Sequence, residues 1–374
     1  MFWSEQHGEW VLTRHADVRA ILRNPAFHPF DLGGAVGAAV NHDSRFPAVR
    51  AVAEAMAVTR SDHGHATVRR FLARVMNSRP LTEIAPLVRS VADALLADGV
   101  KRGGLDLVKD FADVLPVQVI TELLGLPVED APFLAECGEG AAITLLNRSS
   151  APADFRAINA RIALGLDYLH GQIRERRARP RADGLTRMIQ IAPDDLPASD
   201  RDLAVQAYFL FMASMDTTTA FLGGALLALV ENPLECDRWR RGELEAAAAT
   251  EELLRFVSPL QMTPRVAGAR TEINGRMIEA GQRVMLVLAA ANRDPAIYAE
   301  PDRLDLGRGG PPHISFGDGA HSCLGAALAR LEGQIGFSSF IGLPAWRAIS
   351  SPQQWLHHDK LRKIQSLSVE FVAK

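Results

Sequence analysis

The stretch "HISFGDGAHSCLGAALAR", from His313 to Arg330, holds one cysteine flanked by glycines and followed by a run that favours a helix. Phe316, Gly319, Cys323 and Gly325 give the spacing Phe-x-x-Gly-x-x-x-Cys-x-Gly. In a chain of this composition the pattern arises by chance with a probability of roughly 10⁻³. The spacing therefore indicates a dedicated loop around one thiol.

The glycines and the helix after them indicate what the thiol does. Gly317 and Gly319 can adopt backbone angles closed to other residues, so the loop can bend tightly and approach a flat group. Because a helix follows, Cys323 lies near a helix N-terminus, whose free N–H groups favour a thiolate. One thiolate cannot complete a structural zinc site, but it can be the sole protein ligand of a heme iron. A free cysteine is more often a small buried apolar residue, yet the glycines favour the heme ligand.

Charge and cysteine usage limit the class of protein. Among the 374 residues, 41 Lys and Arg face 44 Asp and Glu, a net charge of −3. This near balance argues against nucleic acid or an anionic membrane as a partner. Cys137, Cys236 and Cys323 are odd in number and far apart, which indicates a reducing compartment and a cytoplasmic protein. The first residues resemble neither a signal peptide nor a membrane anchor.

Apolar periodicity predicts a mainly α-helical chain with a smaller β portion. Two stripes repeat at three and four residues and predict helices with one buried face: Ile84, Leu87, Val88, Val91, Leu95 and Leu96, then Ile158, Ile162, Leu166, Leu169 and Ile173. Strand patterns occur in "GEWVLT" and in "TEINGRMIEAGQRVMLVLAA", where Asn274 and Gly275 suit a hairpin turn.

Two further segments have competing interpretations. The apolar run from Leu203 to Val230 is long enough to cross a bilayer, but Asp216 near its centre favours a buried core helix. The arginine-rich segment from Arg174 to Arg187 is predicted to be a solvated helix end that runs into a loop, rather than an anion site.

Taken together, these patterns resemble the cytochrome P450 family in its soluble bacterial, ferredoxin-dependent form. The cysteine loop resembles the family's heme-binding signature. "EELLR" supplies the Glu-x-x-Arg pair Glu252 and Arg255, which in the family joins a later arginine, here Arg308. "AANRDP" also resembles the sequence that the family has between the Glu-x-x-Arg pair and the cysteine. The resemblance implies a triangular-prism helical fold whose small β-sheets and helices enclose heme b.

The domain organisation expected from this resemblance is a single domain over residues 1–374. Its β-rich parts fall near 9–14 and 264–290, and its helical core covers 80–260 and 323–340.

The resemblance also assigns residues to heme b (iron protoporphyrin IX). Its carboxylates need cationic or hydrogen-bonding partners, and the family pattern assigns four: His65, Arg69, Arg265 and His321. The other residues beside the cofactor would be Phe316, Gly317, Gly325 and Ala213. A zinc site made by His63, His65, His321 and Cys323 has permissible ligands but leaves the glycines unexplained.

"FMASMDTTTAF" resembles the family's distal helix, with the pattern Ala-Gly-x-Asp/Glu-Thr. Asp216 and Thr217 would then be the catalytic acid and alcohol that deliver protons for O–O cleavage. A buried polar break in a long helix is the alternative. Ser214 stands where the family usually has glycine, and its hydroxyl would alter the local helix kink or the placement of water.

Positions that line the family's substrate pocket correspond here to Phe209, Met212, Ala213, Leu260, Gln261 and Thr263. Mostly apolar side chains with a few polar groups suit a hydrophobic ligand. Core packing explains Phe209 and Met212 equally well. The segment from Phe30 to Thr59 is expected to cover the pocket.

The implied activity is a heme-thiolate monooxygenase that inserts one atom of O2 into a hydrophobic small molecule: a terpenoid, a steroid, a fatty acid or another secondary metabolite. Electrons would come from NAD(P)H through a separate ferredoxin reductase and ferredoxin, because the remaining cysteines lack cluster spacing. The chain is expected to be a monomer. Two alternatives remain open, a peroxide-driven heme peroxygenase and a non-catalytic heme-binding sensor.

Overall fold

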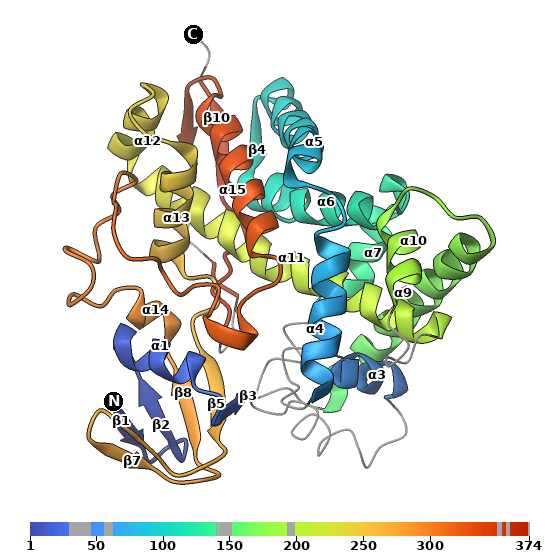
Figure 1. Cartoon of the computed structure of the whole chain (residues 1–374). Helices are drawn as coiled ribbons and strands as arrows, with labels where there is room; N and C mark the ends of the chain where they lie inside the picture. The colour runs from blue at the N-terminus through green and yellow to red at the C-terminus, as the bar shows by residue number, and fades with distance from the viewer. Residues whose placement is uncertain are drawn as a thin grey trace. The chain divides into compact units, whose positions relative to one another are not determined.

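The computed structural model describes residues 1–29, 46–55, 63–139, 141, 152–192, 199–349, 354–356 and 360–372 (Figure 1). Backbone contacts divide the chain into two compact units. The first unit comprises Met1–Phe30, Ala85–Leu115 and Thr217–Lys374, and the second comprises Asp31–Ile84 and Pro116–Asp216. The longest helix, α11 (Asp200–Glu231), runs across the boundary, which falls between Asp216 and Thr217.

The described residues of the second unit form helices and turns and include no strand. Its helices are α3 (Pro47–Ala55), α4 (His63–Met76), α6 (Leu115–Leu124), the 3-10 turn η3 (Val128–Asp130), α7 (Ala131–Gly138), α9 (Pro152–Ala178), α10 (Gly184–Ile191) and the first half of α11. Helix α9 contacts α3, α7 and α10. The predicted apolar stripe of α9, from Ile158 to Ile173, is buried, so this helix and its core face are confirmed.

Arg176 corrects the expectation that the arginine-rich segment is all solvated surface. Its side chain is fully buried on α9, and its Nε donates to Asp183 Oδ2 over 3.0 Å. Asp183 also accepts from the backbone N–H of Thr186 and so caps α10. Arg176 Nη2 donates to the carbonyl of Gly125 over 2.5 Å. One buried guanidinium therefore joins the end of α9 to α10 and to the residue that follows α6.

The first unit combines helices with the chain's small sheets. Its helices are α1 (His15–Arg23), most of α5 (Leu81–Arg102), the π-helical turn η2 (Leu107–Ala112), α12 (Pro233–Arg240), α13 (Ala246–Val257), α14 (Leu288–Ala291), the 3-10 turn η4 (Gly319–His321) and α15 (Ala326–Ile341). Val88, Val91 and Leu96 of α5 are buried as its stripe predicted. The fold class, mainly α with a smaller β portion, is confirmed.

The larger sheet has the strand order β1-β2-β8-β5-β3. The strands are β1 (Phe2–Ser4), β2 (Glu9–Leu12), β3 (Phe27–Pro29), β5 (Thr263–Ala267) and β8 (Arg283–Leu286). Strands β2 and β8 pair in parallel and the other pairs are antiparallel. The smaller sheets are β4-β10-β9, built from β4 (Gly104–Asp106), β9 (Trp346–Ala348) and β10 (Ser368–Phe371), and the hairpin of β6 (Thr271–Ile273) and β7 (Arg276–Ile278).

The hairpin turn and the end of β8 test the strand predictions. Asn274 and Gly275 have φ of 50° and 72°, so the predicted β6–β7 turn is confirmed. The predicted strand segment is too long at its C-terminal end. Strand β8 ends at Leu286, and Leu288–Ala291 forms the helical turn α14.

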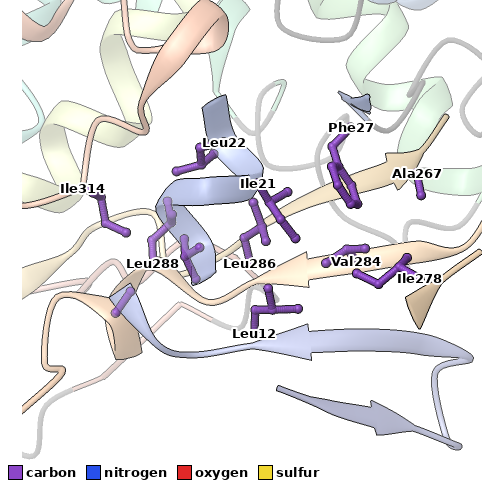
Figure 2. Packing of buried hydrophobic residues seen from close by; sticks show 12 residues of the cluster. Leu12, Ile21, Leu22, Phe27, Ala267, Ile278, Val284, Leu286, Leu288 and Ile314 are labelled. Atoms are coloured by element: carbon purple, nitrogen blue, oxygen red, sulfur yellow. The ribbon is translucent and has the colours of Figure 1, made fainter. Parts of the chain in front are cut away.

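An apolar cluster fixes α1 against this sheet. Figure 2 shows Ile21 of α1 beside Leu286 of β8. Leu12, Ile21, Leu22, Val284 and Leu286 belong to this cluster, and all five are at most 6% exposed. Ile314, at the start of the cysteine loop, belongs to the same cluster. Burying a side chain of this size stabilises a fold by about 1.5–3 kcal/mol. The cluster therefore anchors both α1 and the start of the loop.

Helix α11 is the one helix of the described chain that is long and apolar enough to span a membrane. Within the structure, 78% of its most apolar window is buried. This burial supports the interpretation of the helix as part of a protein core.

Glu332 on α15 is a buried carboxyl group that has no charged partner among the described residues. It is 2% exposed, and its Oε2 has no hydrogen-bond partner among the described residues. Burial raises the pKa of Glu332 from 4.5 to about 8. The folded protein thus keeps this side chain protonated at pH values where the unfolded chain ionises it.

We expect Glu332 to make stability fall as pH rises. Between about pH 4.5 and 8 the folded state holds one proton more than the unfolded state, so the free energy of unfolding declines by about 1.4 kcal/mol per pH unit. A Glu332→Gln variant should lose this slope. The measurement is the urea midpoint at pH 5.5 and 7.5, and equal slopes in both proteins would contradict the assignment.

Candidate functional site

The cysteine loop is closed by its own backbone. The N–H of Cys323 donates to the carbonyl of Phe316 over 2.9 Å. Gly317 and Gly319 between them have φ of 70° and 72°, in the left-handed region that favours glycine. The predicted tight bend is therefore present and rests on these two glycines.

Helix α1 packs closely against the loop. A Cβ atom at Gly319 would lie 2.6 Å from the carbonyl oxygen of Leu22, too close for any side chain. Next to it, Asp318 pairs with Arg19 Nε at 2.8 Å and Arg23 Nε at 2.9 Å. Partial burial alone would raise the pKa of Asp318, but hydrogen bonds from both arginines lower it. Sequence reasoning did not identify this contact, since α1 lies about three hundred residues away.

A second contact holds Phe316. The guanidinium of Arg330 on α15 lies 4.6 Å from the ring centroid of Phe316. Glu251 of α13 binds Arg330 through two hydrogen bonds of 2.6 and 3.0 Å. Partial burial raises the pKa of Glu251, but the neighbouring His313, 3.3 Å away, and the hydrogen bonds from Arg330 outweigh it and lower the pKa to about 2. The Glu251 carboxylate therefore stays charged and orients Arg330 over the ring.

Cys323 differs from the other two cysteines. Its side chain is exposed, whereas Cys137 and Cys236 are buried. Burial raises the pKa of both buried thiols, that of Cys236 to about 11, so they stay neutral. Helix α15 begins at Ala326 with Gly325 as its N-cap, so Cys323 lies just before the helix. A Cβ at Gly325 would lie 3.9 Å from the Cys323 sulfur, and glycine leaves that side of the thiol open.

Arg265 in β5 carries a charge that no described acid neutralises. Its side chain is 6% exposed, and its Nη1 donates to Thr263 Oγ1 at 3.1 Å and to the carbonyl of Pro264 at 2.8 Å. Burial alone lowers the pKa of Arg265 to about 10, and the group remains cationic at neutral pH. A buried guanidinium held only by neutral groups indicates an anion as its missing partner.

The predicted relay residues lie at the middle of α11. Asp216 is 6% exposed, while Thr217 is half-buried and Ala213, one turn earlier, is exposed. Met212 and Met215, on either side of Ala213 and Ser214 in the sequence, are buried. Ser214 Oγ donates to the carbonyl of Phe211 over 2.7 Å. The hydroxyl hydrogen of this unusual serine is therefore used in a hydrogen bond within the helix.

His65 and Arg69 lie one turn apart on the same face of α4, in the second unit, and both are half-buried. His321 ends the turn η4 in the first unit and is also half-buried. The structure therefore places the predicted carboxylate-binding residues on three separate elements, α4, β5 and the cysteine loop.

The predicted pocket residues divide by burial. Phe209 and Met212 are buried on α11, at 8% and 2% exposure. Leu260 and Gln261 lie between α13 and β5, Thr263 begins β5, and all three are half-buried. The Gln261 side chain donates to the carbonyl of Ser258, and Thr263 accepts from Arg265. Of the covering segment, Phe30 to Thr59, only 46–55 falls within the described residues, where it forms α3.

The predicted ion network is assembled around Glu252 on α13. Glu252 accepts from Arg255 Nε at 2.6 Å and Nη2 at 2.8 Å, and from Arg308 Nε at 3.0 Å. The side chains of Glu252 and Arg255 are 1% and 2% exposed. Arg255 Nη1 also donates to the carbonyls of Asn292 and Pro301 at 2.8 and 2.9 Å. The network ties α13 to the segment that leads into the cysteine loop.

The sequence patterns do not identify Asn292 as a site residue, although it stands within the motif "AANRDP". Its side chain is fully buried and bonded to the start of the cysteine loop. The zinc alternative gains no support, because no three His, Cys, Asp or Glu side chains gather as a metal site in the described part of the chain.

Comparison with known proteins decides the family. Nocardicin C N-oxygenase of Nocardia uniformis subsp. tsuyamanensis is 32% identical over 371 residues, covering 96% of this chain and 89% of that protein. Vitamin D(3) 25-hydroxylase of Pseudonocardia autotrophica is 34% identical over 328 residues, covering 87% of this chain and 78% of that protein. The sequence profile "Cytochrome P450" matches residues 246–348. The chain belongs to the cytochrome P450 family.

Solved cytochromes P450 share the fold. The structure of CalO2 superposes with a TM-score of 0.90 at 27% identity, covering 98% of this chain and 91% of that one. P450BioI, solved with an acyl carrier protein that bears hexadec-9Z-enoic acid, gives a TM-score of 0.88 at 27% identity, covering 97% and 92%. The predicted cytochrome P450 fold is confirmed, and the chain is a cytochrome P450 monooxygenase.

Cytochromes P450 use heme b, and the residues described above fit it. An exposed thiol beside a helix start is a donor of the kind that binds heme iron. The buried Arg265, without an acid of its own, suits a propionate carboxylate. Ala213 of α11 is exposed and carries only a methyl group, which allows a flat group to approach closely.

Proposed function

We propose that this cytochrome P450 inserts one atom of O2 into a hydrophobic small molecule, with Cys323 as the sole protein ligand of the heme iron. The observation that carries the assignment is the contrast among the cysteines. Cys323 alone is exposed, in a loop closed by the Phe316 carbonyl, and the other two are buried neutral thiols. When bound, heme b supplies the iron at which dioxygen is activated.

The propionate carboxylates would be held by His65, Arg69, Arg265 and His321. Arg265 is the best supported of these, since its guanidinium is buried and its Thr263 and Pro264 contacts are uncharged. Thr263 then acts by orienting Arg265. Phe316, Gly317, Gly325 and Ala213 would contact the flat faces of the cofactor, where small or planar groups allow close approach.

Asp216 and Thr217 are proposed to move protons. The Thr217 hydroxyl donates a proton to the reacting oxygen, and the Asp216 carboxyl group resupplies it from solvent. Their neighbouring positions and the half-buried state of Thr217 support this role. The Ser214 hydroxyl, bonded to the Phe211 carbonyl, leaves the relay to these two residues.

The substrate is proposed to be apolar, of terpenoid, steroid, fatty-acid or other secondary-metabolite type. Phe209, Met212, Ala213 and Leu260 supply apolar surface, and Gln261 supplies one polar group. One relative points the same way, since it is named for the 25-hydroxylation of vitamin D(3), an apolar molecule.

Electrons are proposed to come from NAD(P)H through a separate ferredoxin reductase and ferredoxin, in the bacterial cytoplasm, to a monomeric enzyme. The three cysteines of the chain are too few for a cysteine-ligated cluster beside the heme. The bacterial origin of the relatives supports the setting.

The proposal is tested by the source of oxidising equivalents. A substrate is first found as a ligand that shifts the heme spectrum, and turnover is then measured with ferredoxin, reductase and NAD(P)H, or with hydrogen peroxide alone. We expect the parent enzyme to form product with the redox partners. A Thr217→Ala variant should still consume NAD(P)H but form product at least about tenfold more slowly, because proton delivery is lost.

Three results would contradict the proposal. Turnover that runs equally well on peroxide alone would indicate a peroxygenase. Heme binding without turnover under any of these conditions would indicate a sensor. A Thr217→Ala variant with parent-like product yield per NAD(P)H would remove Thr217 from the relay.

A further inference from the structure

Asn292, the residue that follows α14, is buried in full and makes three side-chain hydrogen bonds. Its Oδ1 accepts from the backbone N–H of Ile314 over 2.8 Å. Its Nδ2 donates to Ser258 Oγ and to Ser315 Oγ, each over 2.8 Å. Because the Ile314 N–H can only donate, the oxygen of the amide must face it, and the NH2 group must face the two serines.

The two serine hydroxyls require an amide side chain at position 292. Ser258 Oγ donates to the carbonyl of Arg255 over 2.9 Å, and Ser315 Oγ donates to the carbonyl of Leu254 over 2.8 Å. Each hydroxyl carries one hydrogen, so both must act as acceptors toward residue 292. That position therefore needs two donors and one acceptor, which asparagine supplies and aspartate does not.

These bonds connect α13 with the cysteine loop. Leu254 and Ser258 belong to the end of α13, whereas Ile314 and Ser315 directly precede Phe316. The Phe316 carbonyl accepts the Cys323 N–H. Through its own carbonyl, Asn292 also accepts from Arg255 of the buried ion network. The position of Phe316, and through it that of Cys323, thus depends on the amide of Asn292.

We propose that Asn292 is a positioning residue for the heme-ligating thiol. It acts by fixing Ile314 and Ser315, the segment that leads into the cysteine loop. The inference rests on the proposed role of Cys323 as the iron ligand. Asn292 contacts neither cofactor nor substrate in this role. Its removal would loosen the thiolate from the iron, and would not directly affect substrate or proton delivery.

The test uses the heme-loaded, full-length protein and its Asn292→Asp variant. The readout is the red-shifted Soret band of the reduced carbon monoxide complex, which marks a thiolate ligand, and its rate of conversion to the form that lacks this ligand. We expect roughly a tenfold or greater rise in this rate, because the carboxylate cannot donate to either serine and leaves buried groups unsatisfied. Circular dichroism establishes that each variant is folded.

Asn232→Ala is the matched control. Asn232 is also an amide in the first unit, half-buried, and its Nδ2 donates to the carbonyl of Ala228 over 2.8 Å, away from the cysteine loop. We expect its conversion rate to match that of the parent. A parent-like rate in Asn292→Asp, or an equal rise in Asn232→Ala, would overturn the inference. A parent protein without the red-shifted band would instead overturn the role of Cys323.

A milder variant covers the case in which Asn292→Asp does not fold. Ser315→Ala removes one acceptor and leaves one Nδ2 hydrogen unpaired, so we expect a smaller rise of the same rate. Asn292→Ala combined with Ser315→Ala should raise the rate by less than the product of the two single effects, because both changes break the same bond. Independent effects of the two changes would contradict the proposed connection.

Discussion

A Cys323→Ser variant is expected to lose the red-shifted Soret band of the reduced carbon monoxide complex and all monooxygenase turnover. The serine hydroxyl is not ionised at neutral pH and cannot replace a thiolate as an electron-donating ligand. The thiol is the exposed one of the three, so no neighbouring cysteine can take its place.

Cys137→Ser and Cys236→Ser are the controls for this experiment. Both thiols are buried, and burial raises the pKa of each, so neither is expected to bind iron. These variants should keep the red-shifted band, with some loss of stability because a hydroxyl replaces a buried apolar group. A parent-like band in Cys323→Ser, or its loss in either control, would refute the ligand assignment.

Glu252→Gln is expected to lower the free energy of unfolding by about 3–5 kcal/mol, the range found when one partner of a buried pair is removed. Arg255, whose side chain is 2% exposed, would then keep its charge with only neutral partners. Its remaining bonds run to the carbonyls of Asn292, Pro301 and Arg303. Chemical denaturation of the heme-loaded protein measures the change.

The neighbouring residue provides a control of the same chemistry. Glu251→Gln removes a carboxylate from the same helix that binds Arg330 through two hydrogen bonds, but its side chain is 40% exposed and that of Arg330 36%. For such a pair we expect a loss of about 0–1 kcal/mol. Equal losses in the two variants would mean that burial does not decide the contribution of these pairs.

Local patterns were sufficient to predict the helices α5, α9 and α11 and two tight turns. The apolar stripe of α9 follows from residue spacing, because one helix face must be buried whatever packs against it. The turn at Asn274 and Gly275 follows from the backbone freedom of those two residues. The bend at Gly317 and Gly319 follows for the same reason.

Features that depend on distant parts of the chain could not be predicted. Arg176 lies within a charged run that is typical of solvent-exposed helix ends, and only the position of Asp183 and the Gly125 carbonyl makes it a buried group. Glu332 sits at a helix position that would suit the surface equally well. The role of Asn292 requires knowing the partners of two serine hydroxyls, which no sequence pattern records.

The pairing of β2 with β8 determines when the scaffold of the cysteine loop can form during synthesis. Strand β2 joins Glu9 to Arg283 and Leu12 to Leu286, and α1 meets the loop at Gly319. On the ribosome, β2 therefore remains without its partner strand until residues 283–286 have emerged. Such long-range contacts are slow to form. Heme can thus be captured in its final setting only after both β8 and the cysteine loop have been translated.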